Sequence, residues 1–201
     1  MTLPEKGYRD KELARQILGR IRSKMDGAPP VRLMEVCGTH TMSIGRSGLR
    51  RAVPANLALL SGPGCPVCVT PGGYVDAAAR LALGGVTVVT FGDMVRVPGN
   101  TTSLEEARAK GGRLVVAASV TAALDIARQE DGEIVFLAVG FETTAPTIAA
   151  AVLAAERERL HNFSVLVSHK LVPPALRMLL ANPECAVSGF ILPGHVSTII
   201  G

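Results

Sequence analysis

Short apolar runs recur along the chain and alternate with segments of helical periodicity. The runs are rich in Val, Ile and Leu, and each has the length of a single strand. They lie at residues 31–36, 57–61, 86–91, 113–118, 133–139, 164–168 and 189–192. The helical patterns occupy residues 9–24, 72–83, 104–110, 120–130, 145–160 and 174–181. Because strands that are apolar throughout must be covered on both faces, the pattern predicts an α/β protein with parallel sheets flanked by helices, Rossmann-like in architecture.

The length of 201 residues fits one domain or two small ones. We place a domain boundary near residue 140. Residues 1–139 then form a first α/β domain with the N-terminal helix, and residues 140–201 begin a second. No polar linker marks this boundary, and the chain has no internal repeat.

Polar and glycine-rich motifs follow six of the seven predicted strands. They are CGTH (37–40), GPGCPVC (62–68), GDMVRVPG (92–99), GFETT (140–144), SHK (168–170) and PGH (193–195). In open parallel sheets the carboxyl ends of the strands form the edge at which ligands bind. We therefore expect all six motifs to share one edge and one site.

Composition and charge narrow the classes of function. Apolar residues make up 48% of the chain and the net charge is only +4, as in an ordinary globular protein. With no Trp, two Tyr and five Phe, the chain offers no base-stacking platform, so we expect no nucleic-acid partner. Prolines and glycines break up the uncharged stretch 52–75, and the N-terminus has no apolar leader, so we expect a cytoplasmic protein away from membranes.

The cytoplasmic assignment changes how the four cysteines are interpreted. Thiols there are kept reduced, which favours metal, redox or catalytic roles over structural disulfides. Cys37 and His40 are three residues apart, with Gly38 permitting a tight turn. They can ligate one metal together, or the imidazole can lower the pKa of the thiol. A buried structural cysteine beside a hydrogen-bonded histidine explains the same pattern.

Cys65 and Cys68 are separated by Pro66 and Val67. A pair with this spacing can cycle between dithiol and disulfide, or it can supply half of a tetrahedral metal site. A helix that begins near Gly72 can direct its N-terminus at the loop and favour thiolate. Cys37, His40, Cys65 and Cys68 together are also a possible Cys₃His zinc site, although zinc ribbons seldom separate their ligand pairs by a helix and a buried strand.

The motif GFETT combines capping residues with an acid. Thr143 or Thr144 is suited to cap the following helix, with Pro146 in its first turn. Capping does not explain Glu142, which we interpret as a residue that orients a ligand or pairs with Arg96. The histidines at the strand ends, His169 and His195, and the apolar-flanked Cys185 all have ordinary structural explanations.

Six segments, taken together, closely resemble the HypD family of hydrogenase maturation proteins. They are MEVCGTHT (34–41), SGPGCPVCVTP (61–71), FGDMVRVPG (91–99), AVGFETTAPT (138–147), SHKLVPPA (168–175) and LPGHVSTIIG (192–201). They cover nearly the whole chain in the family's order. The resemblance implies a scaffold for the iron centre of nickel–iron hydrogenases. It also implies an iron ion that acquires two cyanides and one carbon monoxide.

The resemblance also implies partners and roles for individual residues. The partners are the small chaperone HypC, the cyanide-donating pair HypE and HypF, and the precursor of the hydrogenase large subunit. Cys37 is implied as the iron-binding thiolate with His40 beside it, and Cys65 and Cys68 as a redox-active pair. The residues implied to line the same cleft are Glu142, Thr143, Thr144 and His195.

One departure from the family concerns its C-terminal part, where full-length members carry the cysteines of a 4Fe-4S cluster. This sequence stops at Gly201 without a four-cysteine motif, so we interpret it as a C-terminally truncated member. Two other functions fit the same residues: a thiol–disulfide oxidoreductase that uses Cys65 and Cys68, and a zinc-stabilised binding module. The motif CGTH favours the scaffold over the oxidoreductase, because an oxidoreductase does not require a third thiol with a neighbouring imidazole.

Overall fold

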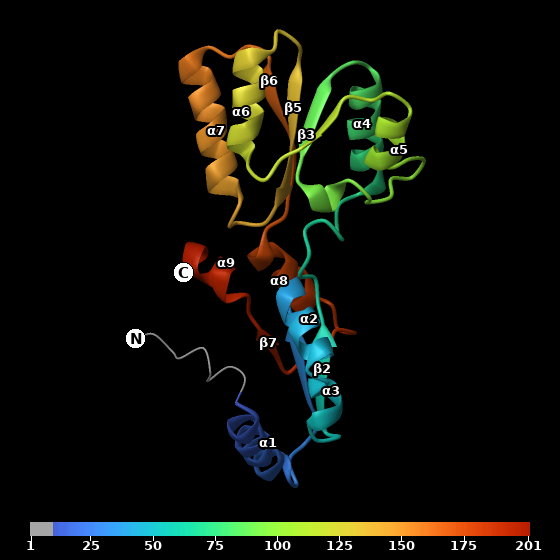
Figure 1. Ribbon diagram of the computed structural model, residues 1–201. Coiled ribbons are helices and arrows are strands. Elements are labelled where there is room, and N and C mark those ends of the chain that lie inside the picture. Colours follow the sequence, from blue (N-terminus) through green and yellow to red (C-terminus); the bar gives the residue numbers. More distant parts are fainter. Residues whose placement is uncertain (1–9) are drawn as a thin grey trace. The chain divides into compact units, whose positions relative to one another are not determined.

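The computed structural model describes residues 10–201, which divide into two compact units (Figure 1). Of the described residues, the first unit contains 10–64 together with Leu176–Pro193. The second contains Cys65–Ala175 and Gly194–Gly201. The boundary expected near residue 140 does not coincide with this division. It falls inside the second unit, because the strands on either side of it pair in register from Ile134 and Phe163 to Gly140 and His169.

All seven predicted strands and all six predicted helical segments are confirmed. The strands are β1 (Val31–Glu35), β2 (Leu57–Ser61), β3 (Thr87–Thr90), β4 (Leu114–Val116), β5 (Ile134–Gly140), β6 (Phe163–His169) and β7 (Gly189–Ile191). The predicted helices are α1 (Lys11–Met25), α4 (Gly72–Leu83), α5 (Leu104–Ala109), α6 (Val120–Gln129), α7 (Ala145–Glu158) and α8 (Val172–Ala181). Four short elements were not predicted: α2 (Gly38–Arg46), α3 (Leu49–Ala52), η2 (Gly92–Met94) and α9 (Gly194–Ile200). Within residues 10–201, no helix is both long and apolar enough to cross a membrane.

The second unit is a three-layer α/β/α structure around a parallel sheet of order β4-β3-β5-β6. Every residue of β5 is buried, and its side chains alternate between two cores. Val135 and Leu137 pack with α4 and α5, whereas Ile134 and Phe136 pack with α6 and α7. Figure 1 shows these two helix pairs on opposite sides of the sheet. The continuous apolar strands therefore indicated the correct architecture.

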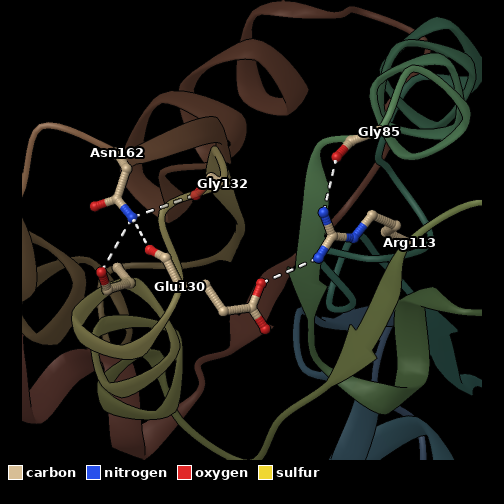
Figure 2. A network of polar contacts seen from close by, with 6 residues as sticks. Gly85, Arg113, Glu130, Gly132 and Asn162 are labelled. Atoms are coloured by element: carbon tan, nitrogen blue, oxygen red, sulfur yellow. Dashed lines mark hydrogen bonds and ion pairs between the residues drawn. The ribbon is translucent and has the colours of Figure 1, made fainter.

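Hydrogen bonds and an ion pair connect the loops at the amino ends of the strands of this sheet, opposite the edge that carries the motifs (Figure 2). The amide Nδ2 of Asn162 donates to the carbonyls of Ala127, Glu130 and Gly132 at 3.0, 2.7 and 3.2 Å, where α6 ends. Arg113 donates to the carbonyl of Gly85 and pairs with Glu130 at 3.2 Å. Asn162 thus satisfies carbonyls at the helix C-terminus that have no partner within the helix.

The first unit has its own parallel sheet, of order β2-β1-β7. Its third strand comes from far along the chain: Glu35 lies opposite Ile191, and the amide of Ser188 donates to the carbonyl of Arg32 at 2.7 Å. The expectation of one shared edge is therefore wrong. The motifs CGTH, GPGCPVC and PGH follow strands of this sheet, and GDMVRVPG, GFETT and SHK follow strands of the other.

A buried acidic residue of α4, Asp76, organises the loop that follows η2 in the second unit. The Asp76 carboxylate, only 5% exposed, accepts from the amides of Asn100, Thr101 and Thr102 at 3.0, 3.0 and 3.3 Å. It also accepts from the hydroxyl of Thr101 at 2.9 Å. The hydrogen bond from the Thr101 amide is the main cause that lowers the pKa of Asp76 below its ordinary value. The charged form thus holds the loop against α4.

We expect Asp76→Asn to lower the Tm by several degrees, because an amide cannot accept four hydrogen bonds and turns its own N–H groups toward the loop. The depressed pKa also fixes the sign of the pH dependence. The carboxylate stabilises the fold above its unfolded-state pKa, and this stabilisation is lost as the pH falls through the folded-state pKa. Thermal melts from neutral to acidic pH test both points. Asp93→Asn, at an exposed position, is the control for loss of charge. Equal Tm values for the two variants across this pH range would contradict the stabilising role of the Asp76 carboxylate.

Candidate functional site

The turn between β1 and α2 in the first unit holds a buried thiol. Cys37 is 4% exposed and occupies the N-cap position of α2, so the first amides of a nine-residue helix lie next to it. Its own amide donates to Oε2 of Glu35 at 3.2 Å. The other oxygen of Glu35, a side chain with no exposed surface, accepts from the hydroxyl of Thr41 at 2.5 Å. A buried carboxylate thus fixes the turn that holds the Cys37 thiol at the N-terminus of α2.

Two glycines bring the loop after β2 against this turn. The Gly62 amide donates to the Glu35 carbonyl at 2.7 Å, and the Gly38 amide donates to the Gly64 carbonyl at 2.8 Å. A Cβ on Gly64 would lie 2.5 Å from the backbone nitrogen and carbonyl carbon of Cys37. Only glycine permits this approach. The sequence therefore places glycine where two strand-end loops of one sheet meet.

We expect Gly64→Ala to destabilise the first unit by about 1–3 kcal/mol, because the new Cβ meets backbone atoms that cannot move aside. Gly45→Ala is the matched control, since Gly45 lies in α2 and nothing approaches its Cβ position within 4 Å. Alanine there should be neutral or stabilising by up to about 1 kcal/mol. Urea denaturation followed by circular dichroism measures both. Equal unfolding free energies for the two variants would contradict this prediction and would show that the loops after β1 and β2 can move apart to admit the new Cβ.

His40 lies in the first turn of α2, three residues after Cys37. Its Nδ1 is buried and pairs with no group of the part of the chain that the structure describes. A buried nitrogen without a partner is costly, so it marks a place where a further group is accommodated. Within residues 10–201 no cluster of three or more His, Cys, Asp or Glu side chains is arranged to hold a metal ion.

Cys65 and Cys68 belong to the second unit and are joined by a disulfide, with their Cα atoms 5.2 Å apart. Cys65 is half-buried and Cys68 is exposed. Val67, between them, packs into the core formed with α4 and α5, and the Thr70 hydroxyl donates to the Pro66 carbonyl at 2.9 Å. The loop is thus anchored through Val67 and the Thr70 hydroxyl. From the spacing of neighbouring strands we predict that the Cys37 sulfur lies within about 15 Å of this pair.

The motif GFETT lies at the carboxyl end of β5 and contacts the end of β6. Glu142, 8% exposed, accepts from the amide of Val172 through Oε1 at 2.7 Å, and its Oε2 is buried without a partner among the described residues. Thr144 is the N-cap residue of α7, with Pro146 in the first turn, as expected. Its hydroxyl makes no capping bond, however. It donates to the Phe141 carbonyl at 3.1 Å and lies 3.1 Å from Nε2 of His169.

Two further residues were predicted for the site, Thr143 and His195. Thr143 is half-buried beside Glu142, and His195 is exposed in the first turn of α9, in the second unit. The alternative pairing of Glu142 with Arg96 is wrong, since Arg96 pairs with Glu105 at 3.3 Å. Cys185 is a free, half-buried cysteine of the first unit.

Sequence reasoning missed two functional candidates. Glu35 was passed over as the end of an apolar strand, although a carboxylate in such a run must find hydrogen-bond donors inside the protein. His169 was given a structural explanation because its partner, Thr144, is 25 residues away in the sequence. No local sequence signal joins the two residues, because their contact depends on the register of β5 against β6, which sets Gly140 opposite His169.

Known proteins match the chain over nearly its whole length. A family model named HypD, described as "Hydrogenase formation hypA family", matches residues 12–201. The hydrogenase maturation factor HypD2 of Bradyrhizobium diazoefficiens is 43% identical over 203 residues, and the factors HypD of Rhizobium leguminosarum and Azotobacter vinelandii are 45% and 46% identical. Each match covers 96% of this chain and 53% of the relative, so the chain spans about half the length of these curated relatives. The chain belongs to the HypD family of hydrogenase maturation factors.

Proposed function

We propose that the protein is a scaffold on which the iron–cyanide–carbonyl centre of nickel–iron hydrogenases is assembled, with iron as its cargo. The observation that carries this proposal is the buried thiol of Cys37 at the N-terminus of α2, fixed by Glu35 and followed by the unpaired Nδ1 of His40. A thiolate is a soft ligand suited to low-spin iron, and imidazole suits the same metal. Two protein donors leave the other positions for cyanide, carbon monoxide and a partner protein.

Cys65 and Cys68 have a separate role in this proposal, as a source of electrons. Two thiols that form a disulfide release two electrons and two protons, and reduction of the disulfide takes them back. The half-buried and exposed positions of the two sulfurs support exchange with a partner. Glu142, Thr143, Thr144 and His195 are proposed to contact the groups that are handled during assembly.

The proposed partners are HypC, the cyanide-donating pair HypE and HypF, and the precursor of the hydrogenase large subunit, all in the cytoplasm. The 4Fe-4S cluster of full-length family members is proposed as the electron supply of the disulfide. We propose that its ligands lie in the part of the relatives that this chain does not match, since the chain spans about half of their length.

The test uses a hybrid maturation factor, in which residues 12–201 of this chain replace the matching part of the Azotobacter vinelandii relative. The hybrid is purified anaerobically with HypC, assayed for iron, and examined by infrared spectroscopy for cyanide and carbonyl bands. We expect iron and both sets of bands in the complex, and hydrogenase activity in a host that lacks its own factor. Restored hydrogenase activity with no iron on the complex would overturn the scaffold role.

The disulfide favours a second candidate, a general thiol–disulfide oxidoreductase. That activity requires Cys65 and Cys68 and makes no use of Cys37. Reduction of a model disulfide at equal rates by the parent chain and by Cys37→Ser, together with an iron-free complex, would support it. The zinc-stabilised module has less support, because sulfurs joined in a disulfide are not thiolates and do not ligate zinc.

A further inference from the structure

The carboxyl ends of β5 and β6 are joined by three contacts between residues at these ends and residues that directly follow them. The amide of Lys170 donates to the carbonyl of Gly140 at 2.9 Å, and the amide of Val172 donates to Oε1 of Glu142 at 2.7 Å. The third contact is between the hydroxyl of Thr144 and Nε2 of His169, at 3.1 Å. His169 ends β6 directly opposite Gly140, so it lies at the strand end from which GFETT begins.

Gly140 makes the contact between Thr144 and His169 possible. A Cβ at Gly140 would occupy the position of the Thr144 hydroxyl oxygen, so only glycine leaves room for that side chain to fold back over the strand end. The side chain of an N-cap threonine usually accepts a hydrogen bond from a backbone amide of its own helix. Thr144 makes no such bond. Its hydroxyl is committed to the Phe141 carbonyl and to His169 instead.

The hydrogen bonds of Thr144 determine which nitrogen of His169 carries the proton. A carbonyl oxygen can only accept, so the single hydroxyl proton of Thr144 goes to Phe141. The hydroxyl oxygen then accepts from His169, which places the proton on Nε2. Burial lowers the pKa of His169, which favours the neutral ring. In a neutral ring with Nε2–H, the other nitrogen, Nδ1, keeps its lone pair.

We propose that His169, at the end of β6 beside the GFETT loop, is a ligand-contacting residue, held by Thr144 as the Nε2–H tautomer so that Nδ1 accepts a hydrogen bond from an N–H or O–H group of the bound species. No group in residues 10–201 hydrogen-bonds this Nδ1, and it is not one of the buried nitrogens without a partner. With the Glu142 carboxylate, it makes this strand end rich in acceptors, which selects ligands that donate. The inference rests on the proposed function of the GFETT loop and names the chemistry that this loop recognises.

The tautomer is tested directly in this chain by nuclear magnetic resonance with ¹⁵N-labelled histidine. The chain has four histidines, so the signal that disappears in His169→Gln identifies His169. We expect the Nε2–H pattern at neutral pH in the parent and in Thr144→Ser, and its loss or averaging in Thr144→Val, which has no hydroxyl. An Nδ1–H pattern in the parent would overturn the proposal.

The ligand contact is tested in the hybrid maturation factor by two substitutions that each keep one half of the imidazole. Gln has a nitrogen that can replace Nε2 against Thr144 and nothing in place of Nδ1, whereas Asn has an oxygen near the position of Nδ1 and does not reach Thr144. We expect His169→Gln to lower hydrogenase maturation by about tenfold or more and His169→Asn to retain more activity, because loss of the Nδ1 acceptor leaves a donor group of the bound species without its hydrogen bond. A purely structural role predicts the opposite order.

His161→Gln, at an exposed position, is the control and should mature hydrogenase like the parent. Full activity of His169→Gln would overturn the ligand contact and leave the proposed scaffold function intact. An inactive parent hybrid would instead contradict the proposed function, while the resonance experiment would still decide the tautomer. Failure of the ligand contact of His169 and failure of the scaffold function therefore give different results.

Discussion

Cys37→Ser should lower the iron content of the complex by at least about tenfold and abolish hydrogenase maturation, because a serine hydroxyl is a hard, protonated group at neutral pH and a poor ligand for low-spin iron. The substitution is well suited to separate chemistry from folding. Serine is a preferred N-cap residue, so α2 should form at least as well as in the parent. The amide that donates to Glu35 belongs to the backbone and stays in place.

Cys185→Ser is the matched control, since Cys185 is a free cysteine in the same unit. It should retain iron, infrared bands and maturation. Iron content and infrared spectra of the two variants, purified with HypC from the hybrid maturation factor, provide the measurement. Undiminished cyanide and carbonyl bands in Cys37→Ser would exclude this sulfur as the indispensable ligand. A loss in both variants would point to folding instead.

The strands were predictable because they are centred on runs of Val, Ile and Leu that are too short to form a helix. β5 is the clearest case, with all seven of its residues buried between two layers of helices. The missed helix α2 shows the opposite situation. It contains Gly38 and Gly45, and its N-cap residue, Cys37, makes no side-chain capping bond. It forms through contacts with Glu35 and the loop after β2, which local sequence does not reveal.

The division into two sheets was not predictable from local patterns. β7 joins β1 through pairs such as Glu35 with Ile191, and nothing in a three-residue strand specifies so distant a partner. The same limit explains the candidate site. Motif positions at strand ends were correct, but their assignment to one edge required the order of the strands. The contacts of Glu35 with Thr41 and of Thr144 with His169 depend on that tertiary order as well.

Cys65 and Cys68 should form a reversible disulfide, and substitution of either residue by serine should abolish maturation while iron remains on Cys37. The Cα separation of 5.2 Å lies in the range that a disulfide spans. We expect folding not to depend on the pair, since Val67 anchors the loop in the core and Cys68 is exposed. Loss of activity in these variants is therefore expected to be chemical, and their circular dichroism spectra should match that of the parent.

Differential alkylation followed by mass spectrometry provides the measurement for this pair. In oxidised protein, only Cys37 and Cys185 should be alkylated under denaturing conditions, and the peptide with Cys65 and Cys68 should be lighter by two hydrogens. After reduction, all four cysteines should react. The serine variants serve as the control, because neither should show the loss of two hydrogens. Stoichiometric zinc that resists chelation and protects Cys65 and Cys68 from alkylation would contradict the redox role, since a zinc-bound thiolate pair does not cycle through a disulfide.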